Sequence, residues 1–296
     1  MAKLIQMTVN KQQSAKLFCF GLGYTAEVFG RRLMSEGWQV AGTCREPARA
    51  ETLRKAGMEV HLFDRDQPLA EAAEILADVD CLLSSVPPDA DGDAVLDLHG
   101  DDITAAGANF GWIGYLSTTG VYGTRDGGWV DERSERRPGA ERSRRRVAAE
   151  DRWQALGAHL FRLAGIYGPG RSVFDQIKAG RARRIHRPEQ VFSRIHVEDV
   201  ATILQASMDH PLAGSAYNVC DNEAAPPADV ITHACDLLGI EPPPLVPFEE
   251  ADLSDMALTF WADNKRVRND RLRQDLGVEL KYPDYRSGLA AILKEV

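Results

Sequence analysis

Paired cysteines, long apolar runs and an excess of basic residues are all missing from this sequence of 296 residues. The five cysteines are Cys19, Cys44, Cys81, Cys220 and Cys235, and their spacing fits neither a disulfide framework nor a metal site. We therefore expect small buried side chains in a cytoplasmic protein, where thiols stay reduced, and no metal ligands.

Membranes and nucleic acids are not expected partners. No apolar run is long enough for a transmembrane helix, and residues 1–15 lack the apolar core of a signal peptide, which predicts a loose tail. The formal net charge of −9 opposes binding to phosphate backbones.

Apolar runs and helical periodicities alternate along the first half of the chain. The spacing predicts helices at residues 26–37, 48–56, 71–77 and 94–106, and strands at residues 17–20, 38–42, 58–63, 79–83, 112–116 and 159–163. Such alternation is typical of an α/β protein with helices on both faces of a parallel sheet. Because crossovers are right-handed, we predict a doubly wound Rossmann-type sheet.

The second half is less regular and predicts a smaller lobe. Residues 123–145 are polar and are expected to form a long surface loop leading into a basic helix. Proline-rich breaks follow, and an amphipathic helix carrying Leu289 and Ile292 ends the chain. We assign residues 16–168 and 191–220 to a dinucleotide-binding domain. Residues 169–190 and 221–296 are assigned to a smaller C-terminal lobe that binds substrate.

A glycine motif follows the first predicted strand and opens the first predicted helix. Gly21 permits a tight turn, Gly23 lets the backbone approach a pyrophosphate, and Ala26 is small enough for helix–strand packing. The helix N-terminus adds amide donors and a positive dipole. The order of strand, motif and helix predicts a dinucleotide site.

The end of the second predicted strand bears on the choice of cofactor. NAD sites usually place a carboxylate there, whereas this chain has Arg45, which can pair with a 2′-phosphate or remain a solvated surface side chain. NADP is therefore favoured, with NAD as the alternative. Asp64 is either an adenine contact or a helix cap. The other predicted cofactor-binding residues are Tyr24, Thr25, Thr43, Ser84, Ser85 and Tyr167.

Four further stretches resemble the extended short-chain dehydrogenase/reductase superfamily of the NAD(P)-dependent epimerase/dehydratase type. They are residues 116–123, 162–170, 194–201 and 217–219. The resemblance covers nearly the whole chain from Lys16 onward. The short glycine loop, Arg45 and residues 282–289 most resemble a bacterial branch labelled YeeZ-like.

The resemblance implies a substrate, often a sugar nucleotide, held between the two lobes. It also implies a Ser or Thr, a Tyr and a Lys around the nicotinamide, the lysine lowering the pKa of the tyrosine so that it acts as acid and base. Thr118 matches the Ser/Thr. Arg142 and Arg146 stand where the tyrosine and lysine are expected. A guanidinium does not deprotonate usefully, so Arg142 cannot replace the phenol.

Tyr122 and Tyr167 are the phenols that could substitute, or they are packing residues that line the site. We take Thr118, Tyr122 and Arg146 as the catalytic candidates, and we interpret His196 as a structural residue at the domain junction. The predicted function is an NAD(P)-dependent oxidoreductase of the epimerase/dehydratase type, acting on a small polar or nucleotide-sugar substrate. The alternative is a non-catalytic NADP(H)-binding or redox-sensing protein. A homodimer is a further expectation.

Overall fold

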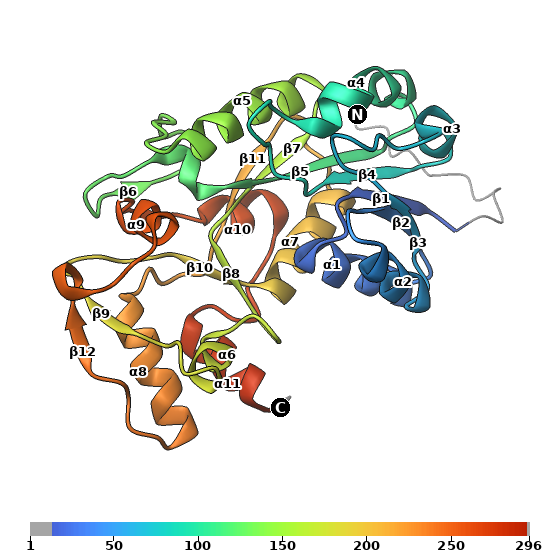
Figure 1. Cartoon of the computed structure of the whole chain (residues 1–296). Coiled ribbons are helices and arrows are strands. Elements are labelled where there is room, and N and C mark those ends of the chain that lie inside the picture. The colour runs from blue at the N-terminus through green and yellow to red at the C-terminus, as the bar shows by residue number, and fades with distance from the viewer. Residues whose placement is uncertain (1–13, 295–296) are drawn as a thin grey trace.

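A parallel sheet of seven strands forms the centre of the computed structural model, which describes residues 14–294. The strands run in the order β11-β7-β5-β4-β1-β2-β3 (Figure 1). They are β1 (Lys16–Phe20), β2 (Gln39–Cys44), β3 (Glu59–Leu62), β4 (Cys81–Ser84), β5 (Trp112–Thr118), β7 (His159–Leu163) and β11 (Ala216–Val219). The order reverses between β1 and β4, which is the doubly wound Rossmann topology. The predicted fold class is confirmed.

Alternating side chains along each strand build two apolar layers. In β1, Leu17 and Cys19 join one buried cluster, whereas Phe18 and Phe20 join the other. A strand buried on both faces reads as a continuous apolar run, as this one does. The first layer is covered by α1 (Tyr24–Ser35), α2 (Pro47–Lys55), α7 (Val197–Asp209) and α10 (Asp270–Leu276). The second is covered by α3 (Ala72–Ala77), α4 (Ala94–Ala106) and α5 (Glu141–Ala155), which lie above the sheet in Figure 1.

The predicted loop at residues 123–145 contains more structure than its composition indicated. Within it, β6 (Trp129–Val130) pairs in parallel with β13 (Arg266–Val267), and α5 already begins at Glu141. Val130 and Val267 are buried together in a small apolar cluster. The partner strand lies more than a hundred residues away, so local composition could not show the pairing.

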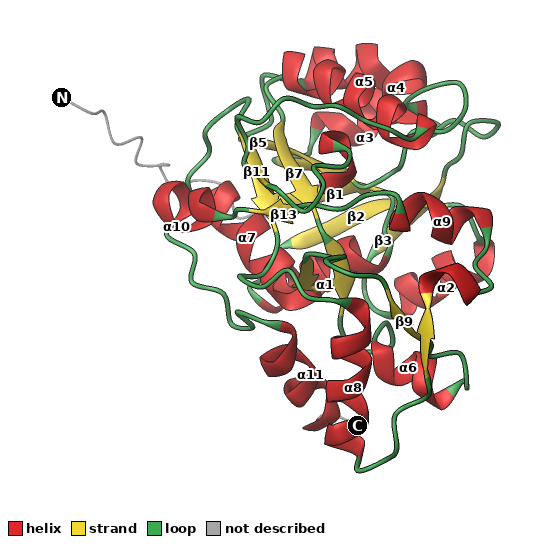
Figure 2. Cartoon of the chain, turned by 90° about the vertical axis from the view of Figure 1, so that its left-hand side faces the viewer, coloured by secondary structure: helices red, strands yellow, loops and turns green. Residues whose placement is uncertain are grey.

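The remaining elements pack beside the carboxyl ends of the sheet strands, with α8 and α11 adjacent in both views (Figures 1 and 2). They are β8 (Gly165–Tyr167), α6 (Val173–Lys178), β9 (Arg184–His186), β10 (Arg194–His196), α8 (Pro227–Leu238), β12 (Leu245–Pro247), α9 (Asp255–Trp261) and α11 (Tyr285–Lys294), with short 3₁₀ turns at Thr119–Tyr122 and Phe248–Glu250. Their core joins Val230 and Ala234 of α8 to Leu289 and Ile292 of α11.

One helix departs from the expected boundary between the lobes. Residues 221–296 were assigned to the smaller lobe, yet α10 within that range packs against α7 and β11 of the main sheet. Its Leu272 and Leu276 are buried in the same cluster as Leu17, because an apolar helix face is most stable where it completes a covered layer. The tail predicted for residues 1–15 lies almost wholly outside the described residues.

The cysteines are all free thiols, as their spacing predicted. Four of them are buried and Cys44 is half-buried. Burial raises the pKa of the Cys81 thiol to about 12, which leaves it an unreactive apolar side chain.

Candidate cofactor and substrate site

The glycine loop after β1 is held by side chains from two neighbouring strands. Gly21 has a φ of +86°, and its amide donates to Thr43 Oγ1 at 2.9 Å, while the Leu22 amide donates to the Thr43 carbonyl at 2.7 Å. Ser85 Oγ donates to the Gly21 carbonyl. The hydroxyls of Thr43 and Ser85, both predicted to bind the cofactor directly, are therefore engaged in shaping the loop.

The start of α1 fits a pyrophosphate. Gly23 is the N-cap, it is exposed, and a Cβ built on it would meet nothing within 4 Å. Thr25 and Ala26 are buried beneath it in the first turn. Ser84 next to the loop is buried, and its hydroxyl has no hydrogen-bond partner among the described residues. Open space before free helix amides fits a dinucleotide phosphate, whereas the buried Ser84 hydroxyl is not accessible to one.

The end of β2 presents Arg45 to solvent. Its side chain is exposed and no carboxylate pairs with it within residues 14–294. Asp64 is committed elsewhere, because its Oδ1 accepts from the amides of Asp66 at 2.9 Å and Gln67 at 2.8 Å. These bonds cap a local turn and not a helix, and the adenine contact stays a prediction.

A cleft of about 920 Å³ opens beside these loops, between the carboxyl ends of the strands and the smaller lobe. It is lined by Thr118 at the end of β5, by Arg142 and Arg146 of α5, and by Tyr167 of β8. The structure thus brings together Thr118, Arg146 and Tyr167, which the sequence analysis predicted for the site. Arg142, at the position where the resemblance predicts a tyrosine, lies with them. The volume of the cleft is in the range of ligand pockets.

Two different contacts orient the arginines of α5. Arg146 Nη1 donates to the Leu116 carbonyl at 2.7 Å and to the Tyr115 hydroxyl at 3.2 Å, which ties the side chain to β5. The Arg142 guanidinium lies 4.0 Å from the centre of the Phe260 ring in α9. Both cations therefore face the cleft from one side of the helix.

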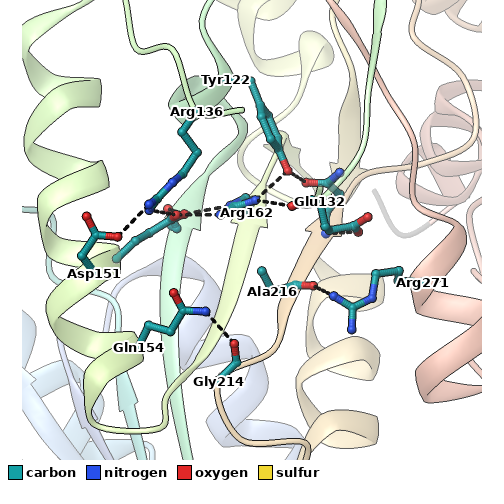
Figure 3. A network of polar contacts seen from close by, with 12 residues as sticks. Tyr122, Glu132, Arg136, Asp151, Gln154, Arg162, Gly214, Ala216 and Arg271 are labelled. Atoms are coloured by element: carbon teal, nitrogen blue, oxygen red, sulfur yellow. Dashed lines mark hydrogen bonds and ion pairs between the residues drawn. The ribbon is translucent and has the colours of Figure 1, made fainter. Parts of the chain in front are cut away.

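Tyr122 does not belong to this cleft, and its nomination as a catalytic residue is corrected. The side chain is fully buried, and its hydroxyl donates to Asn218 Oδ1 at 2.7 Å and accepts from Arg162 Nη1 at 2.9 Å (Figure 3). Burial raises its pKa to about 12. A phenol enclosed by two permanent partners cannot exchange protons with a substrate.

Tyr167 lines the cleft but is a poor acid or base. Its ring packs edge-on against His196, with centroids 5.2 Å apart, and its hydroxyl donates to the Asp284 carbonyl at 3.4 Å. Burial raises the phenol pKa well above its usual range, and the nearby carboxylates of Asp221 and Asp199 raise it further. Gly288 makes room for the hydroxyl, since a Cβ there would lie 2.0 Å from it.

A buried ion-pair network anchors α5 to the sheet, and nothing in the sequence analysis identified it. Glu150 accepts from Ser117 Oγ at 2.6 Å, from Arg162 Nε at 3.0 Å and Nη2 at 2.9 Å, and from Arg136 Nη1 at 3.1 Å (Figure 3). Glu150 lies one helical turn after Arg146 and fully inside the protein. The network therefore fixes the helix that presents both arginines.

Other cleft cations were also missed. Arg171, Arg181 and Arg194 line the cleft, and Arg171 lies 5.6 Å above the ring of Tyr24, beside the glycine loop. The sequence analysis did not identify these arginines because they lie far from the glycine motif along the chain. In residues 14–294 no three His, Cys, Asp or Glu side chains form a group able to hold a metal ion, and none of the helices described there is long and apolar enough to span a bilayer.

The fold and this cleft agree with the sequence motifs. A doubly wound sheet whose glycine loop, β5 end and smaller lobe surround one cleft is the arrangement that the resemblance to the extended short-chain dehydrogenase/reductase superfamily implied. The solved structure of a functionally unknown conserved protein from Silicibacter pomeroyi DSS is 50% identical, with a TM-score of 0.88 over 95% of this chain and 99% of that one. The chain belongs to the same family as that protein.

More distant structures share the fold. A Methylobacillus flagellatus protein assigned to the NAD-dependent epimerases/dehydratases is 24% identical, with a TM-score of 0.72 over 95% of this chain and 98% of that one. A human epimerase family protein solved with NADPH is 15% identical, with a TM-score of 0.72 over 95% and 100%. A Bacillus anthracis dTDP-glucose 4,6-dehydratase solved with NAD is 14% identical, with a TM-score of 0.74 over 95% and 96%.

One curated relative matches half of the chain. It is a 3-diazoavenalumate denitrifying reductase from Streptomyces sp, 29% identical over 153 residues, and the match spans 49% of this chain and 49% of that protein. No protein-family model matches the chain. These comparisons do not test the resemblance to the YeeZ-like branch, which stays a prediction.

Proposed function

We propose that the chain is an oxidoreductase that binds NADP(H) in preference to NAD(H) and acts on a small molecule in the cleft. The observation that carries this proposal is that the glycine loop and the cleft adjoin. Pro87, two residues after the loop-holding Ser85, lines the cleft. On the other side, Tyr24 Oη donates to the Pro169 carbonyl at 3.0 Å, and the adjacent Gly170 also lines the cleft.

The residues that would hold the cofactor follow from the fit already described. The amides at Gly23 and the first turn of α1 would bind the pyrophosphate, with Arg171 beside them. The unpaired Arg45 would bind the 2′-phosphate of NADP, because a guanidinium fork matches phosphate geometry. Fold neighbours solved with NAD and with NADPH support a nicotinamide cofactor of either kind.

When bound, a nicotinamide cofactor supplies or accepts a hydride. The chain's own residues then stabilise charge: Thr118 donates a hydrogen bond to the reacting group, while Arg146 and Arg142 place positive charge where negative charge develops. Neither guanidinium releases a proton. Since Arg142 is exposed at the cleft, water supplies the proton that a tyrosine supplies in typical members of the superfamily.

The test is binding followed by turnover on the full chain. Calorimetric titration should show NADPH binding more tightly than NADH, and loss of NADPH absorbance should follow addition of an accepted substrate from a panel of carbonyl compounds. Absence of binding by both cofactors would refute the proposal.

A second candidate is a nucleotide-binding redox sensor without chemistry. The replacement of the tyrosine and lysine by Arg142 and Arg146 favours it, because proton transfer contributes on the order of 10²–10⁴ to the rate. Tight NADPH binding with no turnover on any substrate of the panel would support the sensor over the enzyme.

A further inference from the structure

The cleft concentrates unpaired positive charge in a protein that is acidic overall. Five of its lining residues are arginines, namely Arg142, Arg146, Arg171, Arg181 and Arg194. None of them lies within ion-pair distance of a carboxylate in the described part of the chain, whereas surface arginines such as Arg31 and Arg65 do. The formal net charge of the chain is −9. Positive charge gathered without a carboxylate in a cleft attracts an anion from solution.

Arg142 and Arg146 form a pair on α5. They are four residues apart, so their side chains share one face of the helix, and Thr118 lines the same cleft. Arg146 uses only Nη1 for its bonds to β5. Its Nε and Nη2, and all the donors of Arg142, have no hydrogen-bond partner among residues 14–294. Two forked donors on one face suit a single carboxylate or phosphate.

One part of the cleft wall is apolar. Val230, Ile231 and Leu289 contribute to it from the smaller lobe, Val191 and Phe192 from the segment before β10, and Arg171 and Arg181 of the smaller lobe also line the cleft. The ring of Phe260, more than half exposed, extends this surface to Arg142. A sugar offers hydroxyls in every direction and would leave many of them unpaired on such a wall, which costs binding energy. A hydrocarbon or aromatic body has no polar groups to leave unpaired against these side chains, so it does not incur this cost in binding energy.

We propose that the substrate is an organic anion with an apolar, ring-sized body rather than a sugar nucleotide. Arg142 and Arg146 hold its carboxylate or phosphate, and the aliphatic wall with Phe260 covers its body. This inference rests on the proposed function, since it names the substrate class of the same cleft. Carboxylate and phosphate share the recognition chemistry, and the experiment distinguishes them.

The test is a set of calorimetric titrations on the full chain saturated with NADP⁺. Benzoate and phenyl phosphate are the anionic aryl probes, benzamide is the neutral analogue of benzoate, acetate is an anion without the body, and UDP-glucose is the sugar nucleotide. We expect one aryl anion to bind at least about tenfold more tightly than benzamide and acetate, as for a charge-assisted contact. The tighter of the two identifies the group.

The variants follow from the structure. Arg142→Ala and Arg146→Ala should each lower the affinity for the favoured aryl anion about tenfold or more without changing the affinity for benzamide. Arg146→Lys should recover part of the lost affinity. Arg144→Ala is the matched control on the same helix, because Arg144 is exposed and pairs with Glu141. The affinities of this variant for the aryl anions and for benzamide should equal those of the parent protein.

The inference is overturned if benzamide binds as well as benzoate and phenyl phosphate, if UDP-glucose binds more tightly than every aryl probe, or if the alanine variants bind the aryl anions unchanged. The first two outcomes need no variant, so misfolding of a variant cannot rescue the inference. Intact NADP⁺ binding beside any of these results leaves the proposed function standing. If the parent protein does not bind NADP⁺, the same titrations are made without cofactor, and aryl-anion selectivity there would refute only the proposed function.

Discussion

Gly21 and Gly23 have different roles in the glycine loop: Gly21 is required by the backbone conformation, and Gly23 by the predicted ligand. Gly21 adopts a positive φ and has Ser85 Oγ 2.9 Å from where its Cβ would be, so any substitution there strains the fold. Gly23 has neither constraint, and its missing side chain matters only to a ligand. A substitution at Gly23 therefore separates binding from folding.

Gly23→Asp should abolish NADPH binding while leaving the unfolding transition nearly unchanged, because it puts a negative side chain before the amides of α1. Titration of NADPH fluorescence and urea unfolding measure the two effects. Gly139→Asp is the control, since Gly139 is also exposed with open space around its Cβ position. Unchanged NADPH affinity in the Gly23 variant would contradict the dinucleotide site.

Arg45→Ala should lower the affinity for NADPH about ten- to a hundredfold and leave the affinity for NADH unchanged, because only the 2′-phosphate would contact the guanidinium. Calorimetry with both cofactors checks this. Arg133→Ala removes another exposed arginine, far from β2 in sequence, and should affect neither cofactor. Equal affinities of the parent protein for NADPH and NADH would disprove the preference.

Asp221 makes stability depend on pH. Its carboxyl is buried, one oxygen has no partner among the described residues, and burial raises its pKa to about 8. Because the folded pKa exceeds the unfolded value near 4, this group stabilises the fold fully below about pH 4, and that contribution is lost as pH rises toward 8.

Asp221→Asn should therefore raise the unfolding free energy at pH 8 by about 1–3 kcal/mol, with less gain at pH 4. Urea unfolding across this range measures the difference. Asp252→Asn, at an exposed position, should not alter the profile. A gain that is the same at every pH would show that the Asp221 carboxyl is not responsible.

At the scale of elements, α5 is the helix on which the site depends. Glu150 bonds it to Ser117 at the end of β5 and to Arg162 in β7, so the helix, and Arg146 one turn earlier, hold a fixed position over the cleft. The pair is fully buried, where removal of one partner leaves a charge without compensation.

Glu150→Gln should destabilise the protein by about 3–5 kcal/mol, because Arg162 then keeps its charge without a carboxylate. Urea unfolding is the measurement. Glu141→Gln at the exposed start of the same helix should leave the unfolding free energy nearly unchanged, since surface ion pairs contribute little. A small loss in the Glu150 variant would mean that the network does not anchor α5.

Elements of regular periodicity could be read from the chain, and irregular ones could not. The helix at 94–106 and the strand at 159–163 begin and end where the sequence placed them. The pairing of β6 with β13 was missed, because each strand has only two residues and its partner is distant in the chain. Short strands carry no period to recognise.

At the scale of the whole molecule, the cleft lies where the carboxyl ends of the strands meet the smaller lobe. The cationic helix α5 lines it on the sheet side, and Val230, Ile231 and Leu289, together with Arg171 and Arg181, line it from the smaller lobe. The substrate class proposed above would therefore contact both lobes. The predicted homodimer concerns the outer surface and stays a prediction.

The sequence by itself determined the doubly wound sheet and the glycine loop, because these depend on local periodicity and on residues adjacent in the chain. The replacement of the usual tyrosine and lysine by Arg142 and Arg146 stays a prediction from the resemblance. Only the tertiary structure decided that Tyr122 is enclosed by Asn218 and Arg162, and that arginines from several elements share one cleft. The physical reason is that the exposure and partners of a side chain are set by contacts between segments far apart in sequence, which no local pattern records.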